Sequence, residues 1–230
     1  MKRNDLIFIS IIILLLLPFF ISKTIFAHYL FINKEHGMVM SFIKFALLAT
    51  LGEVIALRIN TGKYNQPGFG IVPRIIVWGF LGLAINMAFT IFAVGAPAFL
   101  AYLGLKDAPQ AMLGSFSALK LLDALTISIT LNLIFAPIMM TFHTISDTHI
   151  LANGGTLSGL FRPAPFAQIL KTMNWDIMWN FIFKKTIPFF WIPAHTITFL
   201  MPPEFRVLFA AVLGIALGLI LAIGNLKSRG

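Results

Sequence analysis

Long apolar stretches, separated by short polar segments, make up almost the whole chain. They cover residues 6–22, 38–57, 74–96, 119–142, 177–200 and 205–223. A helix needs roughly 20 apolar residues to cross the hydrocarbon core of a bilayer. No stretch alternates polar and apolar residues as a barrel strand would. The pattern therefore predicts an all-α fold, a polytopic membrane helical bundle with about six transmembrane helices.

Proline and glycine predict where these helices end or bend. We expect Gly95 and Pro97 to break the third helix, Pro137 to kink the fourth, and the pair Pro202-Pro203 to force a tight turn. The longest loop is predicted from His143 to Trp175. It should contain one short amphipathic segment, marked by Phe166, Ile169, Leu170 and Met173.

The helices leave no room for a soluble domain, so residues 1–230 are predicted to form a single membrane domain. Residues 1–37 are an additional signal-anchor-like span and loop, and residues 38–230 are the main bundle. Lysine and arginine are more frequent in the segments that share a side with the amino terminus. By the positive-inside rule, both termini are predicted on the cytoplasmic or matrix side.

Composition narrows the class of partner. The chain is 59% hydrophobic and 11% charged, and its net charge of +9 is scattered over loops and helix ends. The lipid bilayer is the predicted partner, in a bacterial inner membrane or an organellar membrane, and no nucleic-acid surface is expected. A homo-oligomer or a larger membrane complex is a further possibility. Cysteine is absent, which excludes disulfides and thiolate metal sites.

Polar residues inside the apolar stretches are the candidate functional residues. An ionised side chain near the bilayer centre is costly, so it usually turns toward a partner or a wet cavity. On this argument a transmembrane pathway would be lined by Glu53, Asn86, Asp123, Lys185 and His195.

Structural roles compete with the pathway at each of these positions. Glu53 could neutralise a buried Lys185 or an arginine, and Asp123 could pair with Lys120 one turn away. Lys184 and Lys185 could snorkel to the interface, and His195 could be a neutral, hydrogen-bonded core histidine.

The last apolar stretch contains a stripe of small residues at four-residue spacing, namely Ala210, Gly214, Gly218 and Ala222. Small residues let helix backbones approach closely in a membrane. The stripe predicts a helix–helix contact, either within the chain or with a second protomer.

Enzymatic signatures are not found. His143, Asp147 and His149 form an array with metal-ligand spacing, but it has no cysteine and no clear fourth ligand. We therefore predict no metal site and no cofactor. A nucleophile elbow, a phosphate-binding loop and a carboxylate pair are also lacking, so the chain is not expected to be an enzyme.

Near the carboxyl end of the chain, Trp191 and Pro193 are followed by Phe199, Pro202 and Arg206. This run resembles the carboxyl-terminal signature of the Mpv-seventeen / PMP-twenty-two family of small integral membrane proteins. Upstream, Gly52-Glu53, Gly82 with Asn86, and Leu122-Asp123 are similar to earlier family segments, in the same order. The resemblance covers about residues 46–230. The chain departs from the signature at His195, Thr198, Leu83 and Ala124, and the family's closing Trp-Asn motif is missing.

The resemblance implies a helical bundle that acts as a weakly selective channel for ions or small metabolites. The buried polar residues also favour a pathway, although only the resemblance favours a channel over a pump. The alternative is a substrate-binding or structural membrane subunit of a multi-component transporter or larger complex. The absence of an ATP-binding motif means that such a transporter would need a separate energising subunit.

Overall fold

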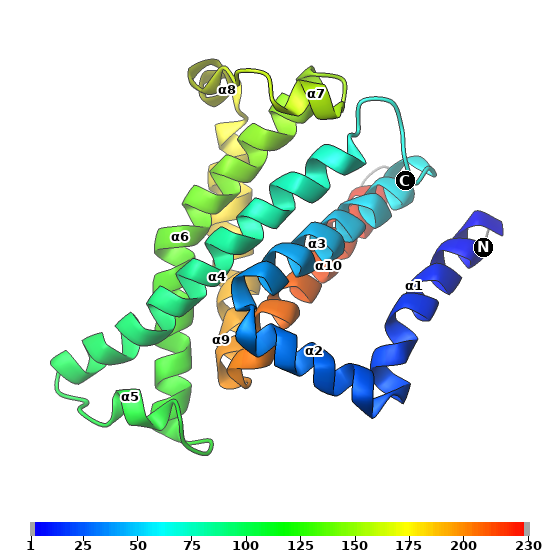
Figure 1. Ribbon diagram of the computed structural model, residues 1–230. Helices are drawn as coiled ribbons and strands as arrows, with labels where there is room; N and C mark the ends of the chain where they lie inside the picture. The colour runs from blue at the N-terminus through cyan, green and yellow to red at the C-terminus, as the bar shows by residue number, and fades with distance from the viewer. Residues whose placement is uncertain (1–2, 228–230) are drawn as a thin grey trace. The chain divides into compact units, whose positions relative to one another are not determined.

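The computed structural model describes residues 3–227, and every regular element in this part of the chain is helical (Figure 1). The shorter elements are α2 (Lys23–Glu35), α5 (Ala108–Ala111), α7 (Leu157–Leu160), α8 (Phe166–Thr172) and α9 (Ile192–Leu200). The longer ones are α1 (Arg3–Ile21), α3 (Gly37–Thr61), α4 (Ile71–Tyr102), α6 (Ala118–Ala152), η1 (Ile177–Trp191) and α10 (Pro203–Lys227). The predicted all-α helical bundle is confirmed.

The described chain divides into two compact units that meet between Met40 and Ser41. The first unit holds α1 and α2, which are joined at Ser22. The Ser22 hydroxyl accepts a hydrogen bond from the Ile25 backbone amide at 3.3 Å, which caps the start of α2. Tyr29 of α2 contacts Phe19 of α1 edge to face, with 5.8 Å between ring centroids.

The second unit is the bundle. Within it α4 packs along α6, and α6 packs along α9 (Figure 1). Its hydrophobic core includes Phe89, Ile127, Leu131 and Phe199. Gly82 allows α4 to approach α3 closely, because a Cβ atom there would lie 2.7 Å from both the Phe45 Cβ and the Ser41 carbonyl oxygen.

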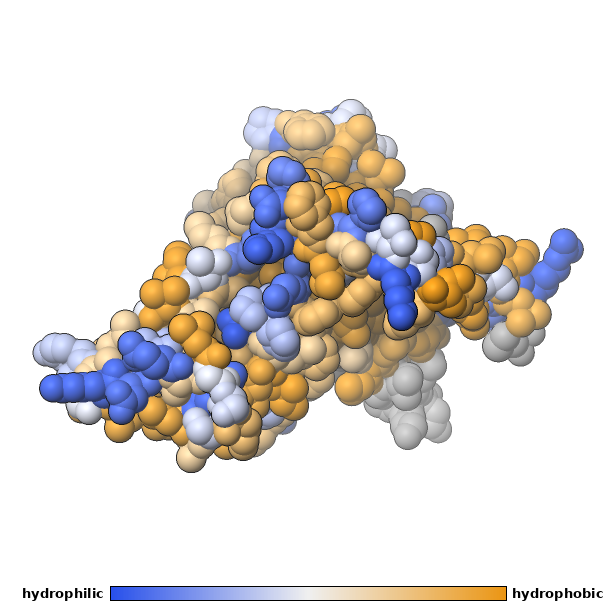
Figure 2. Space-filling view, turned by 60° about the horizontal axis from the view of Figure 1, so that its bottom comes forward, coloured by the Kyte–Doolittle hydropathy of each residue, from blue (hydrophilic) through white to orange (hydrophobic). Residues whose placement is uncertain are grey.

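Many large apolar side chains are exposed on the outside of this bundle, and several polar side chains are buried inside it. Val94, Leu133 and Phe189 are 59–79% exposed, whereas Ser128, Asn132 and Thr198 are fully buried. Figure 2 shows hydrophobic residues over much of one face of the molecule. Among the described residues, five helices are long and apolar enough to cross a membrane: α1, α3, α4, α6 and α10. This distribution suits lipid as the surrounding solvent.

All six predicted apolar stretches are helical. The stretch 177–200 is divided between η1, which is wound as a π-helix, and α9, so neither part alone reaches the length of a span. The predicted turn lies between Leu200 and Pro203, and the predicted amphipathic segment is α8.

Two predicted boundaries are wrong. Helix α4 does not break at Gly95 and Pro97 but continues to Tyr102, because Ala96, Pro97 and Leu100 are buried in the bundle and packing outweighs the lost hydrogen bond.

The fourth helix does not end at Phe142, since α6 continues to Ala152 and includes the segment expected to be a loop. Its threonines explain the error. Thr141, Thr144 and Thr148 donate their hydroxyl hydrogens to carbonyls four residues earlier, so a polar sequence satisfies its side chains within the helix.

Candidate functional site

An ion pair between Glu53 and Arg74 joins α3 to α4. The Arg74 Nη1 lies 2.5 Å from the Glu53 Oε2, and it also lies 2.8 Å from the Asp147 Oδ1 on α6. The Arg74 Nε donates to the Phe69 carbonyl at 2.8 Å. One guanidinium therefore binds two carboxylates and the loop that precedes α4.

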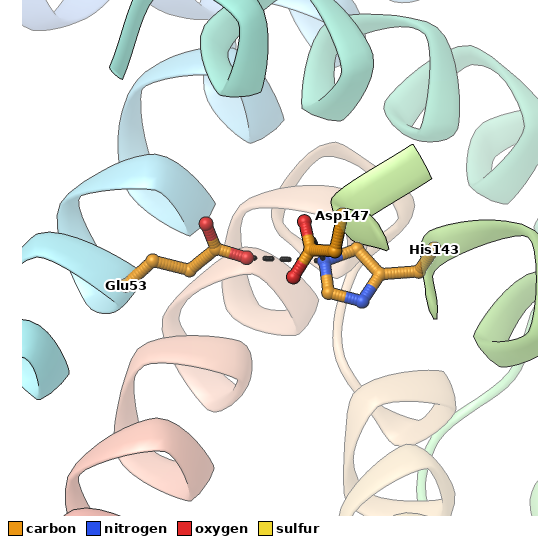
Figure 3. A group of neighbouring side chains, drawn as sticks. All are labelled: Glu53, His143 and Asp147. Carbon is orange, nitrogen blue, oxygen red and sulfur yellow. Dashed lines mark hydrogen bonds and ion pairs between the residues drawn. The ribbon is translucent and has the colours of Figure 1, made fainter. Parts of the chain in front are cut away.

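His143 completes this group. Its Nε2 lies 3.0 Å from the Glu53 Oε1 and 3.8 Å from the Asp147 Oδ1. Figure 3 shows Glu53 on one helix pointing toward His143 and Asp147 on another. The same Glu53 oxygen accepts a hydrogen bond from the Trp78 indole N–H at 3.0 Å. We call Glu53, Arg74, His143 and Asp147 the ionic cluster.

The ionic cluster lies largely out of solvent. The side chain of Arg74 is 6% exposed, that of Glu53 19% and that of Asp147 29%. Two carboxylates and one guanidinium carry a net charge of −1, so a protonated His143 would bring the cluster to neutrality. Charges this far from water require such compensation.

The atoms of Glu53, His143 and Asp147 that could ligate a metal ion lie within 4.8 Å of one another. Arg74 already contacts both carboxylates and supplies the compensating positive charge. The geometry is therefore that of an ion-pair network. His149, the third residue of the predicted array, lies apart from it, near Leu160 and Asn153.

A cavity of about 220 Å³ lies between α3, α4, α6, α9 and α10, beside the ionic cluster. Its lining residues with polar side-chain groups are Glu53, Trp78, Asn132, His143, Trp191 and His195. The remaining walls are mostly apolar and include Phe45, Phe89, Phe135, Met139, Ala211 and Leu217. We call it the central cavity.

Residues 65–73, which form the loop before α4 and its first turn, line a second and more open hollow together with Gly155 and Leu157. We call it the outer hollow. Gly70 lets the loop before α4 approach the Gly155 backbone closely. Its φ is +72°, and a Cβ atom there would lie 2.8 Å from the Gly155 Cα. Phe69 places its ring 4.4 Å from the Arg74 guanidinium carbon. The ionic cluster thus contributes Glu53 and His143 to the central cavity, and its Arg74 directly follows Pro73, which lines the outer hollow.

His195 lines the central cavity from α9. Its Nδ1 lies 2.9 Å from the Asn132 side-chain nitrogen on α6, and its ring stacks on Trp191 at 5.0 Å. Ser128 donates to the Ile192 carbonyl at 2.7 Å, which adds a second polar link between α6 and the segment containing His195.

The structure brings only two of the five predicted pathway residues, Glu53 and His195, to the central cavity. Asn86 is half-buried on α4 outside the lining, and Lys185 is exposed. Lys184 bonds to Asn180 on the exposed side of η1. The convergence of all five residues on one space is therefore not observed.

Asp123 is fully buried, and neither carboxylate oxygen has a hydrogen-bond partner among the described residues. The expected pair with Lys120 is not formed, because the Lys120 ammonium donates to the Gly114 carbonyl at 2.6 Å. For Glu53, the alternative role of neutralising a buried arginine agrees with the structure, because Glu53 forms an ion pair with Arg74.

The small-residue stripe of α10 turns toward the bundle. Ala210 and Ala222 are buried, and Gly214 and Gly218 line the central cavity. A Cβ at Gly218 would lie 3.8 Å from the Gly52 carbonyl oxygen, whereas one at Gly214 would meet nothing within 4 Å. Gly52 itself packs against Ile215, whose Cα would lie 3.1 Å from an added Cβ.

The motif residues near the carboxyl end support the turn between α9 and α10. Phe199 is fully buried, and its ring is tilted by 50° against that of Phe89, with 5.0 Å between the ring centroids. Arg206 donates to the Met201 carbonyl at 3.0 Å and to the Phe199 carbonyl at 3.2 Å. Pro202 lies between the two helices, where no backbone donor is required.

Sequence reasoning missed Arg74 and Trp78 as site residues, and it placed His143 and Asp147 in a loop. The spacing between these residues in the sequence could have indicated that they lie together. Arg74 with Trp78, and His143 with Asp147, are each four residues apart and so share one helix face.

Comparison with known proteins adds no relative: no family model, curated protein or solved structure matches this chain.

Proposed function

We propose that this protein is a multi-pass membrane protein that provides a gated, weakly selective pathway for ions or small metabolites, with the ionic cluster as its gate. The observation that carries the proposal is that the cluster lines the central cavity through Glu53 and His143 and is bonded through Arg74 to the loop whose residues line the outer hollow. Both the resemblance to Mpv-seventeen proteins and the buried charges are consistent with it.

The contacts of Arg74 supply the gating mechanism. Arg74 holds Glu53 of α3 and Asp147 of α6 at once. Separation of α3 from α6 would break these bonds and connect the two spaces. A coupling of about 1–3 kcal/mol changes such an equilibrium about 5–150-fold, so the loss of one ion pair should favour the open form measurably.

Conductance in planar bilayers tests this. Glu53→Gln removes one charge of the cluster and should raise the open probability at least fivefold. It should also shift the reversal potential in a salt gradient toward anions, because a carboxylate beside the pathway is lost.

Lys185→Gln is the matched control, because the Lys185 side chain is exposed and outside the cavity lining. It should leave both quantities unchanged. No conductance from wild type and from Glu53→Gln would refute the pathway, and equal open probabilities would refute the gate.

A second candidate is the substrate-binding subunit of a multi-component transporter. The mostly apolar cavity walls favour it, because they suit a bound ligand better than a hydrated ion. Co-purification of a stoichiometric ATPase, together with no conductance by the isolated protein, would select this candidate.

A further inference from the structure

The hydrogen bonds of Asn132 fix the proton on His195. The Asn132 side-chain nitrogen lies 2.8 Å from the Ser128 carbonyl oxygen, which only accepts hydrogen bonds. This contact orients the amide, so the atom 2.9 Å from the His195 Nδ1 is a donor. A neutral imidazole has one donor and one acceptor. The Asn132 Oδ1 also lies near the His195 Nδ1, but at the longer distance of 3.2 Å. The shorter contact assigns the Nδ1 as the acceptor, so that the Nε2 carries the hydrogen.

This Nε2–H group has no hydrogen-bond acceptor among the described residues. His195 lines the central cavity, with Phe89 edge-on at 5.5 Å and Trp191 stacked at 5.0 Å. Aromatic rings thus flank a donor that still needs an acceptor. A donor that faces an apolar cavity has few partners there, so a ligand that accepts a hydrogen bond from it gains affinity.

The rest of the cavity limits what that ligand can be. Both Glu53 oxygens already accept hydrogen bonds, from Arg74, Trp78 and His143. An ion that stayed bound in the cavity would lose water that the apolar walls do not replace, so the lasting occupant should be uncharged. A dry apolar cavity of about 150 Å³ is large enough for benzene, and the central cavity has about 220 Å³.

We propose that the central cavity binds a small, uncharged organic molecule with an apolar body and one hydrogen-bond acceptor, which accepts from the His195 Nε2–H. This inference rests on the proposed function in that such a molecule is one of the small metabolites that the pathway would carry beside ions. The binding site itself requires no conduction.

Two ligands of nearly the same shape test the role of the acceptor. 4-Fluoroacetophenone carries a carbonyl oxygen, and 1-ethyl-4-fluorobenzene does not. Their binding to the full chain in nanodiscs is measured by ¹⁹F NMR, with empty nanodiscs as the reference for partition into lipid. Wild type should bind the ketone about fivefold more tightly, because one neutral hydrogen bond contributes about 1 kcal/mol.

Two variants distinguish the contribution of the hydrogen bond to binding from that of the cavity volume. His195→Phe should still bind both ligands but without preference for the ketone. Gly214→Leu should bind neither, because its side chain fills the cavity at a position where an added Cβ meets nothing within 4 Å. Thermal unfolding of each variant establishes that it is folded.

Equal affinities of the two ligands for wild type, or unchanged binding by a folded Gly214→Leu, would overturn the inference. Ketone-selective binding without solute flux would leave this site intact and refute only the proposed pathway. Solute flux without any preference for the ketone would support the proposed pathway and refute this binding site.

Discussion

Removal of the Arg74 guanidinium should cost more stability than any exposed charge in the chain. Arg74→Met keeps an unbranched side chain but deletes the bonds to Glu53, Asp147 and the Phe69 carbonyl. It leaves two carboxylates close together without their cation. Loss of one partner from a buried ion pair costs about 3–5 kcal/mol. Because Asp147 is 29% exposed, we expect the lower end, about 3 kcal/mol.

The assay is reversible unfolding in mixed micelles, followed by tryptophan fluorescence. Arg162→Met is the matched control, since Arg162 is exposed and its bond to the Asn153 side chain is 3.4 Å long. It should change the free energy of unfolding by less than about 0.5 kcal/mol.

A second substitution identifies the cause of the loss. Adding Glu53→Gln to Arg74→Met removes one uncompensated negative charge and should recover about 1–2 kcal/mol. If Arg74→Met unfolds like Arg162→Met, or if the double variant recovers nothing, the cluster does not hold α3, α4 and α6 together as described.

Three further predictions concern other parts of the chain. Gly214→Ala should stabilise the protein by up to about 1 kcal/mol, because alanine suits a helix better than glycine and its Cβ has space. Gly82→Ala should destabilise it by about 1–3 kcal/mol, because the added Cβ would overlap with Phe45 and Ser41. Thermal unfolding that ranks the two variants in the opposite order would contradict this packing. Asp123→Asn should not lower the free energy of unfolding, because the carboxylate oxygens have no partner to lose; a loss above about 1 kcal/mol would reveal one. Both termini should be on the same side of the membrane, and protease-accessible tags that report opposite sides would refute this topology.

The helices were predictable because long apolar runs leave few alternatives. The sequence placed all six apolar stretches in helices, and Pro202-Pro203 marked the turn before α10. The extension of α6 to Ala152 was not predictable from polarity, since threonine hydroxyls that bond within a helix look the same in sequence as threonines in a loop.

The candidate site was only partly predictable. The cost of burying Glu53 indicated that a partner must exist, but Arg74 lies 21 residues away across a turn, and a single sequence gives no pairing between helices. The same limit explains Lys185, which shares an apolar stretch with His195 yet lies on the exposed side of η1, whose π-winding shifts the expected helix face.

The most direct test of the account asks whether water reaches the central cavity through the ionic cluster. The chain has no cysteine, so Gly214→Cys places a single thiol in the cavity and Leu133→Cys places one on the exposed apolar surface. Modification by a membrane-impermeant, cationic methanethiosulfonate is followed in proteoliposomes. The account predicts slow modification of Gly214→Cys, a rate at least fivefold higher when Glu53→Gln is added, and no modification of Leu133→Cys in either background. A thiol at position 214 that stays unreactive in both backgrounds, or reacts at the same rate in both, would contradict a pathway gated by Glu53.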